Sequence, residues 1–153
     1  MEPPKLIQDA VKRLCLLFES GGYALTPVID IGALVANADG TVDEKELEML
    51  HYLFRALLGA DLGHDLVEHL VRGSLQIILE AGLAPRARFL AEILLDCGAA
   101  EEGLLVAFGV AYASEGLSAS EREVIDLLAN AAHVSKSRVD ELSEQVRRVT
   151  EAA

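Results

Sequence analysis

The amino-acid sequence predicts an all-α fold, a compact bundle of about eight helices. Apolar residues make up 52% of the 153-residue chain, whereas aromatic residues make up only 5% and Trp is absent. The predicted core is therefore aliphatic, and its excess of Leu and Ala over Val and Ile favours helices over strands. No segment shows the polar–apolar alternation or the Asn-Gly turn that predicts a β-hairpin.

The helices predicted in the first half begin and end at proline, glycine and capping residues. In the first of them, Ile7, Val11, Leu14 and Phe18 recur at helical spacing, and Gly21 follows its end. The second begins at a Thr-Pro pair, the third lies between an acidic cap and a glycine, and the fourth stops at a glycine. The four predicted helices cover about 4–20, 26–38, 44–58 and 66–81.

The second half contains four further helices by the same criteria. Pro85 begins the fifth, and Ser118 and Ser135 precede the seventh and the eighth. The sixth is apolar nearly all round, which predicts a central position, whereas the narrow apolar stripe of the eighth predicts a position on the outside. These four helices cover about 85–98, 101–113, 119 onwards and 136 onwards.

The two halves are related by an internal repeat. A shift of 75 residues places the segment 35–46 on the segment 110–121, with Val-Ala at the start and Glu at the end of both. We therefore expect one domain, 1–153, built from pseudo-symmetric halves of about 4–82 and 84–151 that pack around a pseudo-two-fold axis.

Each repeat contains a helix–turn–helix hinge that ends in a capping box. Asp43 and Ser118 are placed to accept a hydrogen bond from the third residue of the next helix. Glu46 and Glu121 are placed to accept one in return from the N–H of the capping residue. A purely structural role therefore explains much of the acidic character of the hinges.

The first hinge also resembles part of a calcium-binding loop. The segment from Asn37 to Glu46 matches an EF-hand loop from its third position to its twelfth. Val35 stands at the first position, where an EF-hand carries an essential carboxylate, so we expect poor calcium binding. A weaker cation site formed by Asp39, Asp43 and Glu46 is the functional alternative to capping alone.

The hinges carry a family resemblance. The segment 33–46, with its Ala-Asp-Gly and its Glu-containing helix start, and the second copy at 111–121 closely resemble the signature of the TerB-like tellurite-resistance family. Related domains occur in stress-response gene clusters and at the start of a membrane-anchored DnaJ-like co-chaperone. The resemblance implies a helical bundle that binds a divalent cation, with Ca²⁺, Mn²⁺, Mg²⁺ and Zn²⁺ all open.

The resemblance also implies which residues hold the cation. By position they are Asp39 and Glu46 in the first copy and Glu121 in the second. The counterpart of Asp39 is Ser114, with Glu115 beside it, so Glu115 joins the candidate ligands together with Asp43. Because the second copy is less acidic, we expect a cation to bind on the Asp39 side.

Charge and apolar patterning exclude several classes of protein. The formal charge of −12 argues against nucleic-acid binding, which needs clustered Lys and Arg. The longest apolar run, 104–113, is shorter than the roughly 20 residues that a membrane span requires. The N-terminus lacks a signal-peptide pattern, and Cys15 and Cys97 lie in apolar stretches typical of small buried residues. We therefore expect a cytoplasmic protein.

No catalytic motif is recognisable, so we expect a protein that is not an enzyme. Two functions stay open: a TerB-like module that binds a cation in a tellurite or metal stress response, and a protein-interaction module with structural caps. The second would meet its partner in a stress-response or membrane-associated complex.

His64 and Glu68 are four residues apart on one helix, as are Asp65 and His69, a spacing that permits metal sharing but is more typical of a solvated face. His51 and His133 stand alone in the sequence, and the oligomeric state is open.

Overall fold

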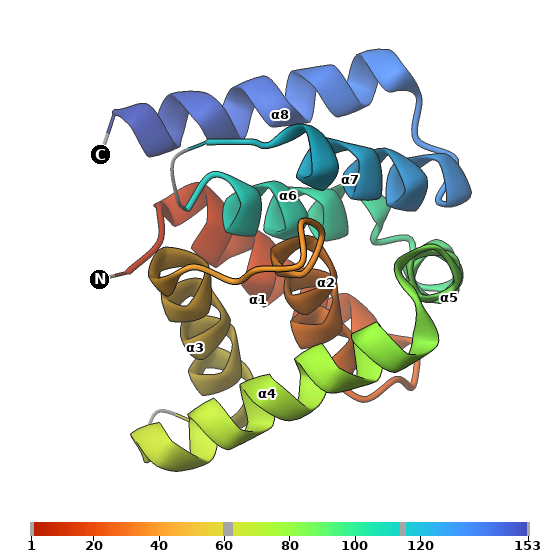
Figure 1. The fold of residues 1–153 in the computed structure, drawn as a ribbon. Helices are drawn as coiled ribbons and strands as arrows, with labels where there is room; N and C mark the ends of the chain where they lie inside the picture. Colours follow the sequence, from red (N-terminus) through yellow and green to blue (C-terminus); the bar gives the residue numbers. More distant parts are fainter. Residues whose placement is uncertain (1, 60–62, 114–115, 153) are drawn as a thin grey trace.

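The prediction of an all-α bundle is confirmed by the structure, a computed structural model that describes residues 2–59, 63–113 and 116–152 (Figure 1). This part of the chain forms eight α-helices and contains no strand. The helices are α1 (Lys5–Ser20), α2 (Thr26–Ala36), α3 (Glu44–Leu58), α4 (His64–Ala81), α5 (Leu83–Asp96), α6 (Ala100–Ala111), α7 (Ala119–Ala131) and α8 (Lys136–Glu151).

Two helices begin earlier than the sequence pattern predicts. α4 begins at His64 instead of about Leu66, and α5 begins at Leu83 instead of Pro85. Pro85 is tolerated as the third residue of α5 because the first N–H groups of a helix have no partner within the helix. Only Gly82, with a φ of 88°, separates α4 from α5, so a single left-handed residue joins the two halves of the chain.

The centre of the bundle consists of α2 and α6, which pack on each other. α2 is buried without interruption from Val28 to Ala36, and most of α6 between Gly103 and Ala111 is buried as well. The predicted central position of the sixth helix is therefore confirmed. Gly32 allows α2 to approach α3 closely, since a Cβ atom there would lie 2.8 Å from a methyl group of Leu53.

The last helices of the two halves, α4 and α8, lie on opposite sides of the bundle (Figure 1). α8 buries Val139, Leu142 and Val146 and packs on α6 and α7, which confirms its predicted outer position. α4 packs on α2, α3 and α5 and leaves Ile77 and Leu79 exposed.

The same neighbours occur in both halves. α2 packs on α3 and α4 as α6 packs on α7 and α8, and α1 packs on α6 as α5 packs on α2. The packing is not identical, because the most extensive contacts of α5 are with α7 whereas those of α1 are with α6. The pseudo-two-fold relation between the halves stays a prediction.

Two further expectations concern surface properties. None of the described helices combines the length and the apolar character that crossing a membrane requires. Cys15 and Cys97 are free thiols, and both are only partly buried, in contrast to the buried positions expected from their apolar surroundings in the sequence. Burial raises the pKa of each thiol, so neither has the lowered pKa that a reactive cysteine requires.

Candidate functional site formed by the paired hinges

The first hinge joins α2 to α3 and contains the predicted capping box. The chain turns at Gly40, whose φ of 83° is readily adopted by glycine. Asp43 Oδ1 accepts a hydrogen bond from Glu46 N at 2.8 Å, and Glu46 Oε1 accepts one from Asp43 N at 3.1 Å. These two bonds satisfy donors at the start of α3 that the helix leaves without partners.

The second hinge joins α6 to α7 and ends in the same way. Ser118 Oγ accepts a hydrogen bond from Glu121 N at 3.1 Å, and Glu121 Oε1 accepts one from Ser118 N at 2.9 Å. Both predicted capping boxes are therefore confirmed. The candidate ligand Glu115 lies outside the described residues.

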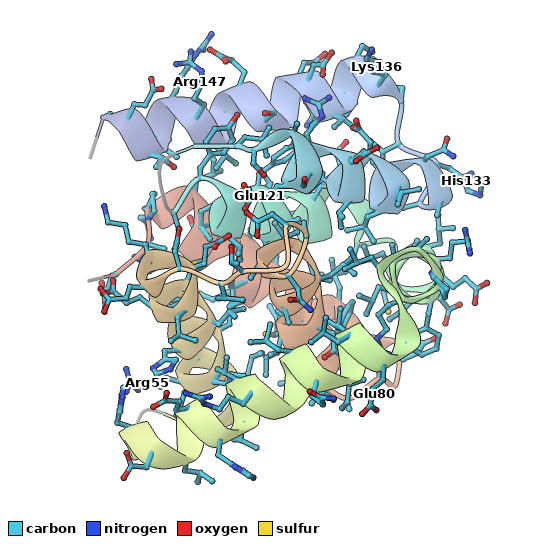
Figure 2. All side chains as sticks on the ribbon, viewed as in Figure 1. Arg55, Glu80, Glu121, His133, Lys136 and Arg147 are labelled. Atoms are coloured by element: carbon cyan, nitrogen blue, oxygen red, sulfur yellow. The ribbon has the colours of Figure 1, made fainter. Side chains whose placement is uncertain are left out.

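The two capping glutamates meet inside the molecule. Glu46 is 5% exposed and Glu121 is 4% exposed, and their carboxyl groups are joined by a hydrogen bond. Figure 2 shows Glu121 where α7 begins, beside the loop that joins α2 and α3. The equivalent residue of each repeat thus contributes one carboxyl group to a single buried pair, which we call the glutamate pair.

The glutamate pair holds a proton more tightly than isolated glutamates do. Burial raises the pKa of Glu46, and the hydrogen bond to Glu121 raises it further, to about 8, although the bond from the Asp43 N–H opposes the rise. Two carboxylates in contact repel each other, which disfavours the ionised form of Glu46 beside Glu121. Near neutral pH the pair therefore carries one shared proton.

The other candidate ligands of the first hinge are engaged locally or lie at the surface. Asp39 is exposed, and its Oδ1 accepts hydrogen bonds from the N–H and the hydroxyl of Thr41, at 3.1 Å and 3.2 Å. Asp39 therefore holds the turn around Gly40. Asn37, at the end of α2, is buried, and its amide nitrogen has no hydrogen-bond partner within the described part of the chain.

The predicted ligands do not form a ready-made metal centre. Among the described residues, no three His, Cys, Asp or Glu side chains are grouped in a way that could hold a metal ion. The donors that do converge are the carboxyl groups of the glutamate pair, and each already accepts one backbone hydrogen bond through Oε1. Oxygen donors of this kind suit a hard cation such as Mg²⁺, which often takes only one or two carboxylates and completes its shell with water. They suit Zn²⁺ less well, because Zn²⁺ favours nitrogen and sulfur.

A second feature, which sequence reasoning missed, is a partly buried ion pair between α2 and α5. Arg86 Nη2 donates a hydrogen bond to Asp30 Oδ2 at 2.6 Å, and the guanidinium carbon of Arg86 lies 4.9 Å from the centre of the Phe89 ring. The pair forms part of the wall of a surface hollow of about 760 Å³. Asp30 interrupts a long apolar run, and a buried acid of this kind signals that a basic partner must lie opposite. The hollow is lined by Tyr23, Ala24, Thr26, Pro27, Asp30, Arg86, Phe89, Glu92, Ile93 and Asp96.

The histidines are arranged differently from what the sequence suggests. His64 Nε2 lies 3.7 Å from Glu68 Oε2, as the four-residue spacing permits, and His69 is exposed on the same helix. His51 is not isolated, because its ring lies against that of His64 with centroids 5.0 Å apart.

Comparison with models of protein families, with characterised proteins and with solved structures finds no match to this chain. Membership of the TerB-like family therefore stays a prediction based on the two hinge motifs.

Proposed function

We propose that this domain is a non-enzymatic TerB-like module that binds a divalent cation at the glutamate pair, as part of a tellurite or metal stress response. The observation that carries the proposal is the meeting of Glu46 and Glu121, two buried carboxyl groups from equivalent positions of two hinges. The stress-response context comes from the resemblance of the hinge motif alone.

The chemistry of the pair supports exchange of a proton for a cation. Two adjacent and largely buried carboxyl groups need positive charge between them, and at neutral pH the shared proton supplies only part of it. A divalent cation would supply more, and Glu46 and Glu121 are the residues that would hold it. Because the cation must displace the proton, its affinity should increase as the pH rises.

The position of the pair gives the cation a structural effect. Glu46 and Glu121 each complete a capping box, so each is tied to the first turn of α3 or α7. A cation between them would hold the two helix starts together, and therefore the two halves of the domain. We expect the bound form to resist unfolding more than the free form.

Thermal unfolding with separate additions of MgCl₂, MnCl₂ and CaCl₂ at mildly alkaline pH tests the proposal. A bound cation stabilises the folded state by RT ln(1 + [L]/Kd), about 2.7 kcal/mol when its concentration is a hundredfold above Kd. Glu46→Gln keeps the capping box, because Gln serves at this position as well as Glu, but removes the charge, so it should abolish the gain. Glu44→Gln, at an exposed position in the same first turn, is the matched control and should retain it.

The cation proposal fails if none of these metals at about 10 mM raises the melting temperature of the wild-type chain. It also fails if Glu46→Gln and Glu44→Gln respond to metal alike. In either case the capping boxes account for the acidic hinges, and binding of a partner protein becomes the better hypothesis.

One observation favours that second candidate function. Phe89 is 48% exposed beside the hollow described above, and Glu92 and Asp96 add negative charge to its wall. An exposed aromatic ring next to acidic residues suits a partner that presents a basic and partly apolar segment. A partner that binds the wild-type chain and Glu46→Gln equally, and Phe89→Ala much more weakly, would support this function over cation binding.

A further inference from the structure

His51 has an unsatisfied nitrogen in the interior of the protein. The side chain belongs to α3, is only 7% exposed, and its Nε2 has no hydrogen-bond partner among the described residues. A buried polar atom without a partner costs free energy, so its presence calls for an explanation such as a ligand. Burial also lowers the pKa of His51, which keeps its ring in the neutral form that binds metals.

The neighbour of His51 is a second imidazole. His64 is the first residue of α4, and its ring is inclined by 57° to that of His51 at a centroid distance of 5.0 Å. Two histidines that share one tetrahedral ion, with metal–nitrogen bonds of about 2.0–2.1 Å, have ring centroids about 5 Å apart. The two rings therefore already have the separation that a shared ion requires.

We propose that His51 and His64 form a binding site for a divalent transition-metal ion of the zinc type, at the contact between α3 and α4. The site is independent of the glutamate pair and of the function proposed for it. It uses nitrogen donors, which favour Zn²⁺, Ni²⁺ and Cu²⁺ over Mg²⁺ and Ca²⁺.

Glu68 lies beside the proposed site. Its Oε2 lies 3.7 Å from His64 Nε2, and its Oε1 accepts a hydrogen bond from Arg72 Nη2 at 2.9 Å. A carboxylate beside a ligating histidine orients the ring and makes it a better ligand. Among the described residues no group of three donors is assembled, so the site offers the ion two histidine ligands. The site should therefore bind more weakly than a closed structural zinc site.

The location of the site predicts its mechanical effect. An ion shared by His51 and His64 would link the third turn of α3 to the first turn of α4. The binding of Zn²⁺ should therefore raise the melting temperature of the domain and change the NMR signals of both rings. Mg²⁺ should have no effect on these signals.

The test is a titration of the full chain with ZnCl₂, followed by the ring signals of the four histidines and by thermal unfolding. His64→Ala should weaken zinc binding at least tenfold and should fold normally, because the side chain of His64 is 66% exposed. His69→Ala, at an exposed position on the same helix, should bind Zn²⁺ as the wild type does. Glu46→Gln should also retain zinc binding at His51, which separates this site from the glutamate pair.

Two results would overturn the proposal. The first is that the NMR signals of His51 and His64 do not respond to ZnCl₂ at about 1 mM. The contact between the two rings would then be an ordinary packing contact. The second is a response that His64→Ala leaves unchanged, which would place the ion elsewhere.

Discussion

Replacing Glu46 by Gln should change the way in which the stability of the domain depends on pH. The substitution preserves the shape of the side chain and the acceptor for the Asp43 N–H, so the capping box at the start of α3 should persist. The amide nitrogen of Gln can donate to the carboxylate of Glu121 in place of the shared proton. What is lost is the group whose proton affinity differs most between the folded and unfolded chain.

The direction of the effect follows from the raised pKa. The pKa of Glu46 is about 8 in the folded protein, against 4.5 for an ordinary glutamate. Between these values the folded chain binds more protons than the unfolded chain, so the free energy of unfolding falls as the pH rises. The contribution is fully present below about pH 4.5 and is lost by the time the pH has passed about 8.

The size of the effect can be bounded. At about 1.4 kcal/mol for each tenfold change in proton affinity, a pKa that rises from 4.5 to about 8 corresponds to at most about 5 kcal/mol. Glu46 keeps the hydrogen bond from the Asp43 N–H when it ionises, so the measured effect should be smaller. We expect about 2 kcal/mol.

Urea unfolding followed by circular dichroism from about pH 5 to about pH 9 measures this difference. The wild-type chain should lose about 2 kcal/mol of stability relative to Glu46→Gln across this range, while the control Glu44→Gln should follow the wild type. Other titrating groups affect all three proteins equally and cancel in the comparison. Parallel curves for the wild type and Glu46→Gln would refute the shared proton.

Further substitutions test the packing. Gly32→Ala should destabilise the domain by about 1–3 kcal/mol in urea unfolding, because the added Cβ would lie within 3 Å of two leucine methyl groups. Gly73→Ala, on α4 where a Cβ meets no other atom within 4 Å, should instead stabilise by about 0.5–1 kcal/mol. Ser118→Ala removes the cap of α7 and should cost about 1 kcal/mol in the same assay. Arg86→Met leaves the buried Asp30 without its partner and should cost about 3 kcal/mol at neutral pH. The loss should be smaller near pH 4, because burial already raises the pKa of Asp30 and an acidic solution protonates it; an equal loss at both pH values would contradict this account.

Local sequence signals were sufficient for most of the fold. The capping residues Asp43, Ser118 and Ser135 each act within one helical turn, so a spacing of three residues predicts their contacts without knowledge of the rest of the chain. The central position of α6 follows from its uniformly apolar surface. The sequence predicts the start of α5 too late, because Pro85 is typical of the first helical residue, although a helix tolerates proline throughout its first turn.

The candidate sites depend on contacts that local signals do not contain. Asp30 and Arg86 are 56 residues apart, and the sequence around each of them does not indicate that the two residues pair. The sequence predicts both glutamates of the pair as caps, but a capping pattern predicts only the partner within the same turn. The approach of His51 to His64 depends on how α3 packs on α4, which helical periodicity does not determine.

The first helix of each half packs on the central helix of the other half. α1 packs mainly on α6, and α5 packs on α2, across the junction at Gly82. A chain cut at Gly82 would therefore give two fragments that each lack one side of a core, and neither fragment should fold alone. Mixed in equal amounts, the fragments should restore each other by complementation. A single fragment could complete its core only by exchange with a second copy of itself, as in a domain-swapped dimer.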